Sequence, residues 1–166
     1  MSGKNPLEGR TEKDWTAKKA EINLCLRAAA LIIKDNKLLA AKSADYDCYY
    51  VVGGGIEINE TSEEAVVREV YEETGCKLEI DRLAFVQERF FTVDDQQFHE
   101  IGFFYLMKDS DKVNISDNSF TDLPSKTETL HWLRISDLCN INIVPKFLKT
   151  KSFDDITGIE HIILKE

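Results

Sequence analysis

Long apolar runs are missing from this 166-residue chain, and no stretch approaches the roughly 18–20 residues that span a bilayer. The four cysteines stand far apart without a C-x-x-C pair, which argues against a zinc ribbon or a redox motif and fits reduced thiols. Residues 1–13 lack the apolar segment of a secretory signal. We therefore expect a cytoplasmic protein with no membrane span.

Basic residues are also scarce: 21 Lys and Arg stand against 30 Asp and Glu, which gives a formal net charge of −9. Proteins that bind nucleic acid polymers neutralise phosphates with Lys and Arg, so such a polymer is not an expected partner. Between residues 54 and 76 the chain carries seven glutamates and a single base, Arg68. Something in this segment must tolerate concentrated negative charge.

The length fits one domain better than two. We expect a polar N-terminal arm over residues 1–22 and a single domain over residues 23–166, because no linker, repeat or low-complexity tract interrupts the chain. Runs of apolar and β-branched residues bounded by turn residues predict strands. The expected strands cover residues 26–33, 37–41, 49–52, 78–93, 97–107 and 129–135. With the helices described next, they predict a mixed α/β fold.

One helix is expected over residues 61–74 and a second, short one over residues 145–149. Thr61 and Glu64 have the spacing of a capping box, and Gly75 is placed to end the first helix. Proline suits the first position of a helix, so Pro145 is expected to begin the second.

Three glutamates of the first helix, Glu69, Glu72 and Glu73, fall within an arc of about 100°. An acidic helix face is usually only solvated. Carboxylates packed beside a sheet repel one another, however, unless a cation neutralises them, and hard ions such as Mg²⁺ or Mn²⁺ prefer oxygen ligands. Arg68 lies one helical turn from Glu64 and Glu72, where it can fix carboxylate geometry.

Three successive glycines, Gly53 to Gly55, precede this helix. They do not form a phosphate-binding P-loop, because no Gly-Lys-Ser/Thr follows, and Ile58 replaces the last glycine of a dinucleotide-binding fingerprint. We expect a backbone kink here whose carbonyl approaches a metal that the helix also binds.

Together these residues resemble the signature of the Nudix hydrolases, G-x5-E-x7-R-E-U-x-E-E-x-G-U, where U is a bulky aliphatic residue. The match falls on Gly54, Glu60, Arg68, Glu69, Val70, Glu72, Glu73, Gly75 and Cys76. Cys76 departs from the usual aliphatic residue, and Asn59 and Val52 depart from a common glycine and proline. The resemblance implies an α/β/α sandwich with a mixed β-sheet.

For the site, the resemblance implies that Glu69, Glu72 and Glu73 bind divalent cations, Mg²⁺ or Mn²⁺, and that the Gly54 carbonyl assists. Arg68 and Glu60 are expected to orient these ligands, and Glu69 is expected to take part in catalysis. Many members of the family recruit a further glutamate from outside the motif as a base or ligand. Here Glu100 is the first candidate and Glu88 the second.

The implied reaction is hydrolysis of a phosphoanhydride bond in a nucleoside diphosphate linked to another group. Arg27 is a candidate phosphate contact, and Tyr50 is a candidate for stacking on a base. An exposed arginine and a core aromatic are the competing interpretations of these two residues. Members often form dimers, so a homodimer is one expected assembly, although the sequence identifies no interface.

Two other functions stay open at this point. One is a module on the same fold that senses a nucleotide or sugar-nucleotide without hydrolysing it, although the intact glutamate set argues against a pure binder. The other is an interaction protein with an acidic helix. Metal-dependent turnover separates the first from an enzyme, and absence of Mn²⁺ binding would favour the second.

Overall fold

The computed structural model describes residues 22–44, 47–108, 110–121, 128–153 and 156–166. The predicted arm lies outside these residues except for Ile22, which begins the first strand. In chain order the elements are β1 (Ile22–Leu31), β2 (Ile33–Lys34), β3 (Lys37–Ser43), β4 (Tyr49–Val51), β5 (Gly53–Gly55), α1 (Ser62–Thr74), β6 (Ile80–Val93), β7 (Gln96–Met107), η1 (Ser110–Lys112), β8 (Ser119–Phe120), β9 (Glu128–Arg134), η2 (Ile135–Asn140), β10 (Ile143–Val144), η3 (Lys146–Lys149) and β11 (Glu160–Lys165). The elements labelled η are 3-10 helices.

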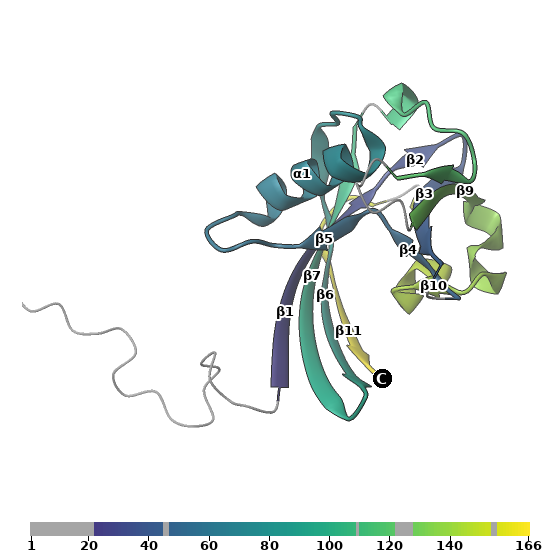
Figure 1. Ribbon diagram of the computed structural model, residues 1–166. Coiled ribbons are helices and arrows are strands. Elements are labelled where there is room, and N and C mark those ends of the chain that lie inside the picture. Colours follow the sequence, from purple (N-terminus) through teal and green to yellow (C-terminus); the bar gives the residue numbers. More distant parts are fainter. Residues whose placement is uncertain (1–21, 45–46, 109, 122–127, 154–155) are drawn as a thin grey trace, which may run out of the picture.

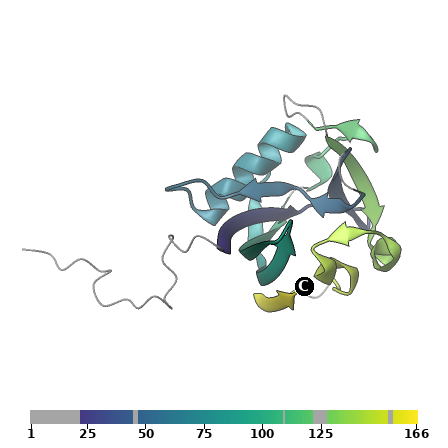
Figure 2. The same ribbon diagram turned by 60° about the horizontal axis from the view of Figure 1, so that its bottom comes forward.

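The strands form two sheets (Figure 1). One has the order β11-β6-β7-β1-β5, and the other has the order β10-β4-β3-β9-β8, with β2 paired to β3. Strand β1 is parallel to β7 and antiparallel to β5, so the first sheet is mixed. Helix α1 covers one side of the strands and the short helical turns after β9 cover the other (Figure 2). The predicted α/β class is confirmed.

The second half of strand β1, residues 28–31, is buried on both faces. Ala28 and Ala30 belong to the core cluster that also contains Val66 and Val70 of α1, whereas Ala29 and Leu31 belong to the cluster on the opposite side. A strand buried on both faces carries a continuous apolar run instead of an alternating one. This explains the uniform apolar sequence that predicted the strand.

Helix α1 begins and ends as its sequence predicts. The Thr61 hydroxyl accepts a hydrogen bond from the Glu64 backbone N–H at 3.2 Å, and the Glu64 carboxylate accepts one from the Thr61 N–H at 2.9 Å. This is the reciprocal capping box, which satisfies two donors that the first turn leaves unpaired. Gly75 adopts the left-handed conformation, with φ of 68°, and closes the helix.

Three local features differ from the expectations. The first strand begins at Ile22 and not at residue 26. The three glycines form strand β5, because the absence of side chains lets Gly53 lie against β1, where a Cβ would approach the Ala28 carbonyl oxygen to 2.3 Å. In place of the predicted helix over residues 145–149, the structure has the 3-10 helix η3 over Lys146–Lys149. A 3-10 helix is common where a helical segment is only four residues long.

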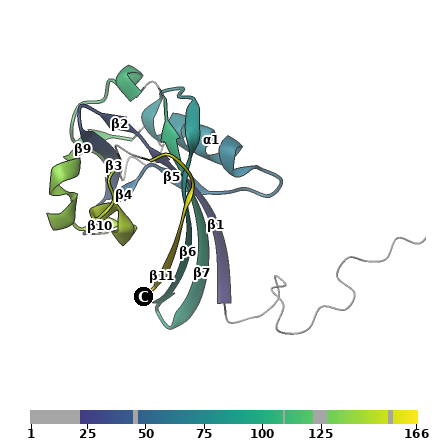
Figure 3. The ribbon, with the colours of Figure 1, turned by 180° about the vertical axis from the view of Figure 1, so that it is seen from behind.

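Strands β1, β6, β7 and β11 extend together beyond the part of the sheet that α1 covers (Figure 3).

Within the described ranges, no helix is long and apolar enough to cross a membrane.

Candidate active site

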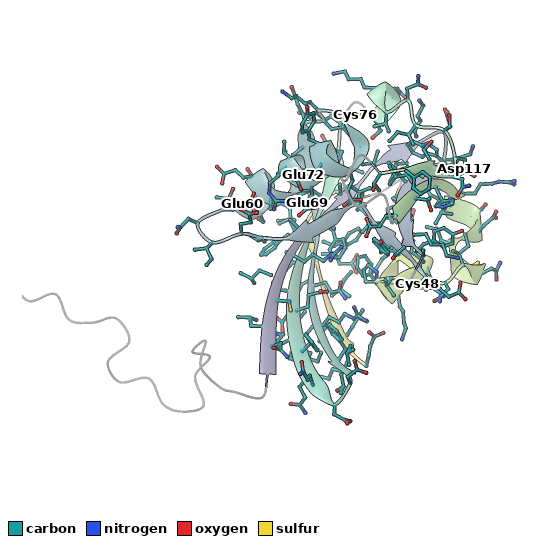
Figure 4. The ribbon with its side chains drawn as sticks, viewed as in Figure 1. Cys48, Glu60, Glu69, Glu72, Cys76 and Asp117 are labelled. Atoms are coloured by element: carbon teal, nitrogen blue, oxygen red, sulfur yellow. The ribbon has the colours of Figure 1, made fainter. Side chains whose placement is uncertain are left out.

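Arg68 connects the acidic residues around α1. Its Nε and one terminal nitrogen donate to the two Glu60 oxygens at 2.8 and 2.9 Å, and its other terminal nitrogen donates to Glu69 at 2.8 Å and to Glu72 at 3.3 Å. It also donates to the Gly55 carbonyl oxygen at 3.0 Å. Figure 4 shows Glu60, Glu69 and Glu72 close to one another, with Cys76 at the far end of the helix. One guanidinium group thus fixes three carboxylates.

The electrostatics of this cluster follow from the same contacts. The Arg68 hydrogen bonds, together with the Glu57 backbone N–H, lower the pKa of Glu60 to about 2. The carboxylates in turn raise the pKa of Arg68, so the pair is ionised at any physiological pH. Arg68 thus pairs with Glu60 and with two of the expected ligands, Glu69 and Glu72, whereas Glu64 serves the capping box instead of Arg68.

Gly54 of β5 lies directly against the Glu69 side chain of α1. A Cβ at this position would lie 2.2 Å from Glu69 Oε1, so any side chain would displace the carboxylate. The Glu69 side chain is 14% exposed. Glycine at this place therefore lets the helix present Glu69 directly against the backbone of the strand.

Glu73 is the most deeply buried acid of the described residues, with 4% exposure. One oxygen accepts a hydrogen bond from the Gly53 N–H at 2.9 Å, while Oε2 is buried without a partner in the part of the chain that is described. Burial raises the pKa of Glu73 to about 8, and Glu128 and Glu69 add to this effect. A buried carboxylate with an unbonded oxygen is costly unless a proton or a cation compensates it.

Glu69 and Glu73 open onto a cavity of about 470 Å³ between the two sheets. Four carboxylates and two guanidinium groups line it together with an apolar wall. The lining residues are Arg27, Ser43, Cys48, Tyr50, Val51, Gly53, Glu69, Glu73, Arg89, Glu100, Phe104, Glu128, Val144 and Pro145. This volume suits a small molecule.

Both candidate substrate contacts lie in the cavity wall. Arg27, on β1, donates to the Gly53 carbonyl oxygen at 2.7 Å, close to the backbone that holds Glu73. Tyr50, on β4, donates its hydroxyl to Glu128 Oε1 at 2.6 Å. Burial and this hydrogen bond raise the pKa of Tyr50, so its hydroxyl stays protonated.

The two candidates for an additional glutamate lie on opposite faces of the first sheet. Glu100 pairs in register with Arg89, and both line the cavity. Glu88 is the neighbour of Arg89 along β6 and so points to the other face, where its carboxylate lies 3.1 Å from His161 Nε2. Glu100 is therefore brought to the cavity and Glu88 is not.

Two charged residues of the cavity wall were not predicted from the sequence. Glu128 is the first residue of β9, and Arg89 is held by the Glu166 carboxylate at 2.7 Å. Neither belongs to a motif, and both reach the cavity only because distant strands pair. One sequence signal could have placed Arg89: it lies opposite Glu100 in the β6–β7 hairpin, so both side chains point to the same face of the sheet. This inference requires the correct strand register.

The donor set fits a divalent cation, although no group of three or more His, Cys, Asp or Glu is already gathered as a metal cage among the described residues. Glu73 offers an unbonded buried oxygen, and Glu69 opens onto the same cavity. Glu72 is more exposed, at 44%, and shares Arg68 with Glu69. Carboxylate oxygens are the donors that hard cations prefer.

Comparisons with known proteins find a matching family and several relatives. A model of the NUDIX domain matches residues 25–152, which is more than half of the chain. A MutT-like protein of Streptomyces ambofaciens is 43% identical over 56 residues, 34% of this chain and 36% of that protein. Diphosphoinositol polyphosphate phosphohydrolase 3-alpha of Mus musculus is 39% identical over 84 residues, 51% of this chain and 49% of that protein.

An ADP-ribose pyrophosphatase of Methanocaldococcus jannaschii is 50% identical over 48 residues, 27% of this chain and 28% of that protein. The chain thus spans about half or less of the length of these relatives. Among solved structures, the MutT protein from Methanosarcina mazei Go1 aligns with a TM-score of 0.57 at 18% identity, over 78% of this chain and 91% of that one. At this identity the likeness concerns the fold alone.

Proposed function

This chain belongs to the Nudix family, and from that premise we propose that it is a metal-dependent pyrophosphohydrolase. Its substrate in this proposal is a nucleoside diphosphate linked to another group, and a phosphoanhydride bond is cleaved. The observation that carries the proposal is the Glu73 carboxylate, buried beside Glu69 with one oxygen unbonded. A buried carboxylate oxygen of this kind can serve as a ligand of a bound cation.

In this proposal Glu69, Glu72 and Glu73 hold Mg²⁺ or Mn²⁺, with the Gly54 carbonyl assisting. The chemistry that the bound ion supplies is charge neutralisation on the diphosphate and activation of a water molecule. Arg68 keeps the carboxylates in position through its contacts with Glu60, Glu69 and Glu72. The acidic protein and the acidic substrate are then compatible.

The other proposed roles belong to residues of the cavity wall. Glu100 lines the cavity and is proposed to accept the proton of the attacking water. Arg27 lies beside Gly53 and is proposed to contact a phosphate. Two relatives are named for activity on ADP-ribose and on a diphosphoinositol polyphosphate. Of these two substrate classes, we propose the nucleotide for this chain.

The test is a hydrolysis assay on a panel of nucleoside diphosphate derivatives with Mg²⁺, with Mn²⁺ and with EDTA. We expect activity with the metals and none with EDTA, and a loss of at least about 100-fold in Glu73→Gln. Glu63→Gln, an exposed glutamate of the same helix, is the matched control and should keep the wild-type rate.

Rates that are equal with and without EDTA, or unchanged in Glu73→Gln, would refute the proposal. Nucleotide binding without any turnover would favour the sensing module instead. Circular dichroism of each variant establishes that the fold is intact before rates are compared.

A further inference from the structure

The hydrogen bond between Tyr50 and Glu128 joins two strands that are not neighbours. Tyr50 lies on β4 and Glu128 on β9, and β3 runs between them. Ala41 of β3 is in register with Tyr50, and Ser43 is in register with Glu128, so small side chains fill the space between the two. The pair is therefore a built feature of the cavity wall and bridges strand β3 of the second sheet.

This pair presents hydrogen-bond acceptors to the cavity. The Tyr50 hydroxyl has one proton and donates it to Glu128. Among the described residues, this bond uses one of the two Glu128 oxygens, and a carboxylate has about four acceptor sites. A ligand group that lies here must therefore bring its own N–H or O–H donors.

A highly phosphorylated ligand does not suit this wall. Phosphate oxygens are acceptors and anions, and Glu128 lines the same cavity as the carboxylates of Glu69, Glu73 and Glu100. The cationic groups of the described lining are Arg27 and Arg89. Arg27 is already proposed for a phosphate of the diphosphate, and Arg89 is paired with Glu166, so neither is left for a further cluster of phosphates.

Most of the remaining wall is apolar. Val51, Phe104, Val144 and Pro145 line the cavity beside Tyr50 and Glu128. Apolar surface with a few convergent polar groups is the usual lining of a site for a neutral ring.

We propose that the Tyr50–Glu128 pair determines substrate specificity. It selects a nucleoside diphosphate whose other substituent is a neutral ring bearing N–H or O–H donors, and it disfavours a substituent ring that carries several phosphates. The inference rests on the proposed hydrolase function and adds the part of the substrate that lies outside the diphosphate. Glu128 and Tyr50 are specificity residues in this scheme and take no part in bond cleavage.

The experiment compares kcat and KM on two substrates with Mg²⁺, a nucleoside diphosphate sugar and a diphosphoinositol polyphosphate. The variants are Glu128→Gln and Tyr50→Phe, each of which removes one polar function and keeps the size of the side chain. Glu63→Gln and Tyr71→Phe, exposed on α1, are the matched controls. We expect the wild type to prefer the nucleoside substrate.

On that substrate, Glu128→Gln and Tyr50→Phe should each raise KM about tenfold and leave kcat within about threefold, because a polar contact common to ground and transition state is lost. Wild-type preference for the phosphorylated inositol would overturn the inference. So would a large fall in kcat at constant KM in Glu128→Gln, since that result places Glu128 in the chemical step.

Calorimetric binding of the nucleoside diphosphate sugar in EDTA, where no metal-dependent hydrolysis takes place, separates this inference from the proposed function. If no diphosphate is hydrolysed, the hydrolase proposal fails, yet a tenfold weaker affinity of Glu128→Gln than of wild type still supports the recognition pair. Equal affinities of wild type and both variants overturn it, whatever the turnover.

Discussion

Arg68 and Glu60 form a two-point ion pair, with nitrogen to oxygen distances of 2.8 and 2.9 Å at the two carboxylate oxygens. Eight residues separate them, and Glu60 lies outside α1, so the pair fastens the loop before the helix to the middle of the helix. The same guanidinium holds Glu69 and Glu72. The position of the candidate metal ligands therefore depends on a residue that binds no metal itself.

Arg68→Lys tests this dependence. An ammonium group keeps the charge but cannot form the planar two-point contact with Glu60 and reach Glu69 at the same time. We expect a loss of about 10- to 100-fold in kcat with the fold retained, as for other residues that orient ligands.

Steady-state kinetics and circular dichroism measure the two effects of this change. Arg134→Lys changes an exposed arginine of β9 and is the control for replacing an arginine by a lysine away from the site. A variant with wild-type kcat would show that the guanidinium does not position the site.

Much of the site could be predicted because it is local in sequence. Thr61, Glu64 and Gly75 fix the two ends of α1, and the spacing of Glu69, Glu72 and Glu73 places them on one side of it. Arg68 meets Glu60 because both belong to a short loop–helix segment. These relationships depend on helix geometry and need no knowledge of the tertiary fold.

The remainder depends on strand pairing. Glu128 contacts Tyr50 across 78 residues of sequence, and no motif indicates which strands become neighbours. Glu100 and Glu88 were both candidates, because their opposite directions follow from the register of β6 with β7. The cytoplasmic location and the homodimer stay predictions, as does the separate polar arm.

Gly54→Ala tests the close approach of β5 and α1. The added Cβ would lie 2.2 Å from Glu69 Oε1, so the carboxylate must move, and we expect at least a tenfold loss of kcat and weaker Mn²⁺ binding by about the same factor. Gly55→Ala is the control, because a Cβ there has open space and the carbonyl that binds Arg68 is retained.

Kinetics and a Mn²⁺ titration followed by calorimetry compare the two alanine variants. Equal losses in both would mean that the general flexibility of the glycines matters and that contact with Glu69 does not.

Glu73 should make the stability of the metal-free protein depend on pH. Its pKa is raised from the ordinary value of 4.5 to about 8 in the folded chain. Below pH 4.5 the group is protonated in both the folded and the unfolded state. Between pH 4.5 and 8 the unfolded chain releases the proton while the folded chain retains it, so the free energy of unfolding falls as pH rises, and above pH 8 the loss is complete.

Urea unfolding in EDTA at pH 5 and pH 9 measures this effect against Glu73→Gln, which is neutral at both values. Because the other titrating groups are shared, the difference between wild type and variant isolates the carboxyl. We expect this difference to shift in favour of the variant by up to about 4 kcal/mol between pH 5 and pH 9. If it is the same at both pH values, Glu73 ionises in the folded protein without cost, and the argument that its burial requires a compensating cation fails.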